Sequence, residues 1–251
     1  MTYDNQCFYL LLPPQYATDR LGDRANPVEE VEMLKMPMFD CDVCENIRTG
    51  YRPLFLPVTN IDLLLRLAAP RLQHDEWWAL ARDLHAYLNL PQNEQIQPGD
   101  VLGTPTYEIS RTVYSDCVML VPETFVKDRV AEAMSTAGLT GYNLFKPGFV
   151  AGRRYKGPLD ELSLLHIHGR AWRKGTQKIV QCERCQRTKR TLVSPEIDVD
   201  RWDGADVFTI DGIESIIGLS QKAYRVFVEN QVTNVLLLEI TPSTPLNPFV
   251  L

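Results

Sequence analysis

The sequence predicts an α+β protein: a mixed or antiparallel sheet flanked by helices, with a four-cysteine zinc knuckle joining its N- and C-terminal segments. Three observations support this fold class. Short apolar runs bounded by Pro or Gly are typical of buried strands, and residues 75–88 show a helical apolar repeat. Two C-x-x-C motifs lie far apart, so a zinc-binding element is expected from 38–50 and 178–192.

Strands and two helices are predicted in the N-terminal half of the chain. Residues 7–12 are apolar and stop at two prolines, which indicates a short buried strand. The polar residues 15–37 predict a loop with one edge strand, and residues 98–109 predict a loop that enters a strand. Residues 61–69 form a short apolar helix. The clearest helix, 75–88, has acidic residues in its first turn and one apolar stripe: Trp77, Ala81, Leu84 and Leu88.

Two later stretches, 115–145 and 205–240, share a plan of strand, helix, turn and strand. In the first, Pro122 suits the first helical position and Gly138 the residue just past the helix end. Its apolar stripe is Val126, Val130, Met134 and Ala137. In the second, Ser220 is a natural N-cap. Three of its residues are expected to face inward: Tyr224, Phe227 and Val228.

This likeness has two interpretations. It arises either from a duplication or from two α+β units that resemble one another by chance. We expect one domain over 1–251. If a duplication occurred, this domain would contain two similar α+β subunits, at about 98–150 and 200–242.

The composition is that of a globular protein. The chain has 251 residues, of which 45% are hydrophobic and 23% charged, which excludes a disordered tail, a collagen-like repeat and a coiled-coil rod. A chain of this size buries a core without disulfides, so Cys7 and Cys117 are expected as small core residues. No apolar run reaches the roughly 20 residues that span a bilayer, and the first run is too short for a signal peptide. We therefore expect a soluble cytoplasmic protein without a membrane partner.

The charge is unevenly distributed along the chain. There are 26 Lys or Arg and 32 Asp or Glu, a formal net charge of −6. Residues 170–190 hold eight of the basic residues and one Glu, which leaves 18 basic and 31 acidic residues, near −13, elsewhere. The basic segment, with Trp172, could follow a phosphate backbone. There are two alternatives to nucleic-acid binding. The basic residues form a solvated face, or they compensate the charge of about −2 on a zinc held by four thiolates.

The two C-x-x-C motifs are the strongest chemical signal. In each, the two-residue gap lets a tight turn aim both thiolates at one point, and two such turns supply a tetrahedral zinc site. The predicted ligands are Cys41, Cys44, Cys182 and Cys185. Four ligands leave no open position, so the zinc would be structural. Because 137 residues separate the two pairs, unrelated or metal-free pairs and redox dithiols remain as alternatives.

No catalytic frame is recognisable, and we expect that the protein is not an enzyme. The familiar serine-hydrolase, phosphate-loop, H-E-x-x-H and dinucleotide-binding motifs are missing from the sequence. His166 and His168 lie two apart on a predicted strand, where such a pair can bind a metal or transfer protons. The simpler interpretation is two half-buried strand histidines. His74 and His85 are expected as cap or surface groups.

In their order, these motifs resemble those of the double-CxxCG-motif immunity proteins of bacterial toxin–immunity systems. The parallels are an N-terminal strand, CDVC at 41–44, PGDVLGTP at 98–105, the VPETFVKDRVAEAMSTAGLTGYNL unit, CERC at 182–185, and a final strand, serine-capped helix and strand. This chain departs from the pattern in the residue after each pair, where Glu45 and Gln186 replace glycine.

The resemblance implies a cytoplasmic antidote that binds a cognate toxin domain and occludes its active site, with a structural zinc on the four cysteines. Many toxins that attack nucleic acids are basic, and an acidic body would speed their association. The alternative is a zinc-dependent nucleic-acid-binding protein that uses residues 170–190. The sequence leaves open the toxin, the contact surface, the oligomeric state and the role of His166 and His168.

Overall fold

The computed structural model describes residues 7–12, 28–39, 43, 54, 57–69, 71–92, 96–111, 113, 115–120, 123–155, 161–174, 177–182, 184, 188–191, 196–210 and 213–242. The helices are α1 (Ile61–Leu67), α2 (His74–Tyr87), α3 (Asp128–Thr136) and α4 (Gln221–Glu229). The strands of the first half are β1 (Phe8–Leu12), β2 (Val28–Lys35), β3 (Val101–Arg111), β4 (Cys117–Leu120), β5 (Glu123–Lys127), β6 (Tyr142–Phe145) and β7 (Gly148–Arg154). Those of the second half are β8 (Leu162–Ile167), β9 (Gly169–Arg173), β10 (Gln177–Gln181), β11 (Thr188–Thr191), β12 (Ile197–Asp198), β13 (Val207–Ile210), β14 (Ile213–Leu219) and β15 (Leu236–Ile240).

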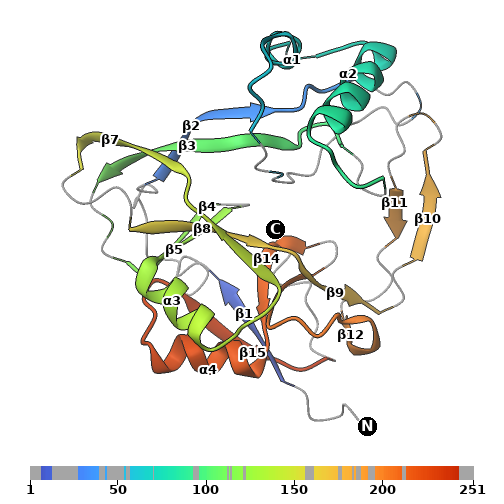
Figure 1. The fold of residues 1–251 in the computed structure, drawn as a ribbon. Coiled ribbons are helices and arrows are strands. Elements are labelled where there is room, and N and C mark those ends of the chain that lie inside the picture. Colours follow the sequence, from blue (N-terminus) through green and yellow to red (C-terminus); the bar gives the residue numbers. More distant parts are fainter. Residues whose placement is uncertain are drawn as a thin grey trace.

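These elements form a mixed α+β fold, as the sequence predicts (Figure 1). The described strands make four sheets, with the orders β12-β9-β13-β14-β1-β15, β4-β5-β8-β6, β2-β3-β7 and β10-β11. Most neighbours are antiparallel, whereas β3–β7 and β9–β13 are parallel. In Figure 1, α3 and α4 lie at the end of the molecule opposite α1 and α2. No helix in the described ranges is long and apolar enough to cross a bilayer.

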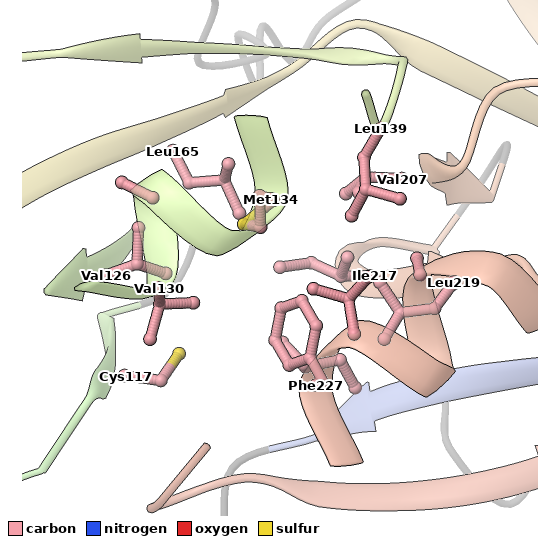
Figure 2. Close-up of a cluster of buried hydrophobic side chains, with 14 of the residues drawn as sticks. Cys117, Val126, Val130, Met134, Leu139, Leu165, Val207, Ile217, Leu219 and Phe227 are labelled. Atoms are coloured by element: carbon pink, nitrogen blue, oxygen red, sulfur yellow. The ribbon is translucent and has the colours of Figure 1, made fainter. Parts of the chain in front are cut away.

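Helices α3 and α4 cover one shared core between the two larger sheets. Met134 of α3 and Phe227 of α4 point into the same cluster, between side chains of β5, β8, β13 and β14 (Figure 2). Ser220 caps α4 by accepting a hydrogen bond from the Ala223 N–H, as predicted. Gly138 lies just past α3 with φ +58°, also as predicted.

A second core lies under α1 and α2. The predicted 75–88 helix spans His74–Tyr87, and its stripe buries Trp77, Ala81 and Leu84. The Asn60 side chain accepts hydrogen bonds from two N–H groups in the first turn of α1. Met36 and Phe39, which follow β2, are buried in the same cluster.

Two predictions of local structure are wrong. The helix does not begin near Pro122, because Glu123–Lys127 is strand β5, whose Phe125 pairs with Leu164 of β8. Val228 is 47% exposed, whereas Tyr224 and Phe227 pack against the core as predicted. The predicted loop that enters a strand at 98–109 is confirmed, and the strand begins at Val101.

Gly141 is required by a close backbone approach. It has φ +92°, and a Cβ there would lie 2.1 Å from the Val207 carbonyl oxygen. We expect Gly141→Ala to lower the free energy of unfolding by about 3 kcal/mol or more, measured by urea denaturation. Gly138→Ala is the matched control, because its φ is also positive but nothing lies within 4 Å of its Cβ position. That control should lose only about 1 kcal/mol, and equal losses would contradict the close-approach argument.

Candidate metal centre

The second C-x-x-C lies in the connection of a β-hairpin. Strands β10 and β11 pair up to Gln181 and Thr188, so residues 182–187 join them. Cys182 follows β10 directly and is 7% exposed, whereas Arg184 is an exposed turn residue. This is the hairpin position at which a zinc knuckle presents its thiolates. Cys185 lies outside the described residues.

The chain before the first C-x-x-C is firmly held. The Met36 N–H donates to the Asp100 carbonyl at 2.8 Å, and the Leu72 N–H donates to the Met38 carbonyl at 3.0 Å. Phe39 is 1% exposed. Cys41 and Cys44 lie outside the described residues, and between them Val43 is a turn residue that is 66% exposed.

The structure brings the surroundings of the two motifs together. Cys182 belongs to the same buried cluster as Met36, Phe39 and Trp77. Phe39 precedes Cys41 by two positions, so a residue next to the first pair packs in the cluster that contains a cysteine of the second pair. Segments that are far apart in the sequence, at Phe39 and at Cys182, thus pack in one cluster.

His74, at the start of α2, contacts both motif regions. Its ring meets Phe39 edge-on at a centroid distance of 5.5 Å. Its Nε2 lies 3.1 Å from the carbonyl oxygen of Arg184, inside the second motif. The Trp78 indole N–H donates to Nε2 at 2.8 Å, and Nδ1 lies 2.9 Å from Asp75 Oδ1. The hydrogen bond with His74 lowers the pKa of the Asp75 carboxyl.

The role of His74 was missed from the sequence, which predicted a cap or surface group. Its contact with Arg184 spans 110 positions, and no local pattern shows such a contact. The only local signal is the cluster His74, Trp77 and Trp78, which places a polar ring beside large apolar ones.

The donor set fits a closed zinc site, since four thiolates on two tight turns are the usual ligands of structural zinc. In the described ranges, no three His, Cys, Asp or Glu side chains gather around one point. Three of the four predicted ligands fall outside those ranges, so the fit depends on Cys182, on the β10–β11 hairpin and on the contacts of His74.

His166 and His168 do not share one strand. His166 is in β8, where it pairs with Asn143 and lies 5.9 Å from the Phe145 ring. His168 is outside the strand, is exposed, and its backbone N–H donates to the Gly141 carbonyl. The expectation that both lie on one strand is wrong, because β8 ends at Ile167 and β9 begins at Gly169.

The first part of the basic segment makes contacts within the protein. The Arg201 guanidinium lies 4.5 Å from the Trp172 ring centroid, and Lys174 pairs with Glu196 at 2.8 Å. Arg173 is 5% exposed, and burial lowers its pKa. Arg170 is exposed, and its backbone N–H donates to Asp203 Oδ2 at 2.7 Å. The side chains of Lys178, Lys189 and Arg190 are outside the described set.

Comparison with known proteins gives no family assignment: no protein-family model matches the chain, and no curated protein matches it.

Proposed function

We propose that this protein is a cytoplasmic immunity protein that binds a cognate bacterial toxin domain and occludes the toxin's active site. The order of motifs along the chain and its resemblance to the double-CxxCG-motif immunity proteins support the class. One structural observation carries the proposal furthest: His74 contacts Phe39 and Arg184, next to the two cysteine pairs. A double motif whose halves act together is what the resemblance implies.

The zinc has a structural part in this proposal. The zinc would be coordinated by Cys41, Cys44, Cys182 and Cys185. It would cross-link the segment after β2 to the β10–β11 hairpin. His74 would pack beside the second turn, where its Nε2 accepts from the Trp78 indole N–H and lies 3.1 Å from the Arg184 carbonyl oxygen. With all four positions taken by protein, the metal would activate no water.

Neutralisation would proceed by binding alone. The chain outside 170–190 is near −13, with 18 basic and 31 acidic residues. An acidic surface raises the association rate with a basic toxin domain at low salt and fixes its orientation. Steric occlusion then needs no reacting group on this protein.

Growth rescue tests the class directly. The neighbouring genes are searched for a toxin domain, which is then expressed in bacteria with the wild-type chain or with the empty vector. We expect growth with the wild-type chain and arrest without it. Arrest in both cultures, with the protein present at normal levels, would contradict the immunity function.

The basic segment provides a second arm of that experiment. A chain with Arg184, Arg187, Lys189 and Arg190 all replaced by alanine should still rescue growth, and its association rate with an inactive toxin domain should fall as salt rises. Loss of rescue, together with salt-dependent binding of the wild-type chain to nucleic acid, would favour the zinc-dependent nucleic-acid-binding function instead. An association rate that is insensitive to salt would remove the charge argument.

A further inference from the structure

The two larger sheets repeat one arrangement. The strands of the sheet β4-β5-β8-β6 are arranged like the last four strands of the other sheet, β13-β14-β1-β15, and all pairs are antiparallel. In each, a hairpin leads into a helix, the helix leads into an outer strand, and a strand from elsewhere lies between hairpin and outer strand.

Strands β8 and β1 pair with their neighbours in the same register, whereas the hairpin β13–β14 has a register shift that β4–β5 lacks. Adding 93 to the residue numbers of α3 (128–136) gives those of α4 (221–229). The same shift of 93 positions relates Val126 to Leu219 and Leu144 to Leu237. Val126 and Leu144 face Ser163 and Leu165 of β8. Leu219 and Leu237 face Tyr9 and Leu11 of β1. Strand β8 therefore occupies in one sheet the place that β1 occupies in the other, residue for residue.

Two Asp–Thr contacts, each made of two reciprocal hydrogen bonds and here called clasps, join the two arrangements. Asp116 precedes β4, and its N–H donates to Thr233 Oγ1 at 3.0 Å, while the Thr233 N–H donates to Asp116 Oδ2 at 2.9 Å. Asp206 precedes β13, and its N–H donates to Thr140 Oγ1 at 3.2 Å, while the Thr140 N–H donates to Asp206 Oδ2 at 3.1 Å. Thr140 and Thr233 are related by the shift of 93 positions. In each clasp, the aspartate of one arrangement is therefore hydrogen-bonded to the threonine of the other.

The neighbours of the clasps correspond as well. The carbonyl of Asp116 accepts from the Lys127 N–H, and that of Asp206 accepts from the Ser220 N–H, both at 2.8 Å. Lys127 and Ser220 are the N-cap residues of α3 and α4. The shared core contains side chains from equivalent positions of the two arrangements: Cys117 and Val207, Val126 and Leu219, and Met134 and Phe227 (Figure 2). Leu165 and Leu11 are a fourth such pair in the same cluster.

We propose that the chain is a duplicated unit whose two copies have exchanged their first strands. In chain order, each copy is a strand, an insertion, a hairpin, a helix and an outer strand: β1 to β6 in the first copy and β8 to β15 in the second. β1 pairs in the sheet of the second copy, and β8 pairs in the sheet of the first. The surface around α3, α4 and the clasps is thus an interface between two copies of one unit, with the isologous contacts of a twofold dimer. Chance likeness of two α+β units does not explain the shared register around β8 and β1 together with reciprocal Asp–Thr contacts.

The duplication also accounts for the double cysteine motif. Cys41 and Cys44 fall between β1 and β4, and Cys182 and Cys185 fall between β8 and β13, so each insertion carries one pair. Val43 and Arg184, the third residues of the two motifs, are both exposed turn residues. Each pair is then half of one metal site, as in a metal shared by two subunits. This last step rests on the zinc site of the proposed function.

Cleavage between the copies tests the exchange. A protease recognition sequence replaces residues 156–160 in the full-length chain, which is folded and then cut. We expect the two fragments to co-elute as a 1:1 complex with an unchanged circular dichroism spectrum, and to separate only in denaturant, since each sheet contains a strand of the other fragment. Separation in native buffer would overturn the proposal.

Threonine variants then test the clasps. Thr140→Val and Thr233→Val should each weaken the association of the fragments by about fivefold to tenfold. Thr209→Val is the matched control, because Thr209 Oγ1 donates to the Gly169 carbonyl within one fragment, and it should leave the association unchanged. An effect of Thr209→Val equal to the other two would overturn the reciprocal clasp. None of these readouts involves zinc or a toxin, so a failure here is distinct from a failure of the proposed function.

Discussion

Serine in place of either cysteine pair is expected to abolish zinc binding and to destabilise the protein. The double variants are Cys41→Ser with Cys44→Ser, and Cys182→Ser with Cys185→Ser. Two remaining thiolates do not hold a structural zinc, so each variant should lose all of its metal. The lost link between the α1–α2 core and the β10–β11 hairpin should cost about 3 kcal/mol or more, a fall in Tm of about 6–12 °C for a chain of this length.

The readouts are zinc by elemental analysis and Tm by calorimetry. Cys7→Ser is the control, because Cys7 lies ahead of β1, is half-buried and belongs to neither pair. It should retain the wild-type zinc content. If either double variant kept about half of the zinc, the pairs would bind separate metals, and both the shared site and the half-site equivalence would be contradicted.

Loss of the Asp116 carboxylate is expected to have the largest effect of any single side-chain truncation outside the cysteines. The residue is 5% exposed, and its carboxylate accepts hydrogen bonds from Arg129 and from both the N–H and the hydroxyl of Thr233. Asp116→Ala leaves these donors without their acceptor and should lower the free energy of unfolding by about 3 kcal/mol. The control Asp83→Asn, in an exposed pair with Arg66, should change it by less than about 1 kcal/mol.

The same carboxylate predicts a pH dependence. Burial of Asp116 opposes ionisation, but the hydrogen bonds from Arg129 and Thr233 outweigh it and lower the pKa to about 2 from the usual 3.8. Because the folded-state pKa is depressed, the stabilisation of about 2 kcal/mol is complete above pH 4 and is lost as the pH falls towards 2. Acid denaturation of Asp116→Asn should lack this part of the pH dependence. If Asp116→Asn lost stability at low pH just as the wild-type chain does, the pH dependence would not come from Asp116.

The sequence predicted elements that depend on local patterns. Strand β1, helix α2, the Ser220 cap and Gly138 follow from apolar periodicity, capping chemistry and backbone conformation, and all are present. Strand β5 was mistaken for helix because its partner, β8, lies far along the chain. Propensity reasoning does not include such pairings.

The candidate metal centre also has features that local sequence patterns predict and features that they do not. The ligand set comes from the cysteine spacing alone and stays a prediction, whereas the contacts of His74 with Phe39 and Arg184 arise only when α2 packs against both motif regions. The likeness of the two later stretches was visible in the sequence. The exchange of β1 and β8 was not, since Leu11 pairs with Ile217 across almost the whole chain.

The most direct test of this account is the metal content of the wild-type chain. Protein purified under reducing conditions is analysed by native mass spectrometry and by elemental analysis, so that zinc is measured per chain. We predict about one zinc per chain, released as the four thiols become reactive. Less than about half an equivalent of zinc, with four titratable thiols in the folded protein, would contradict the shared site.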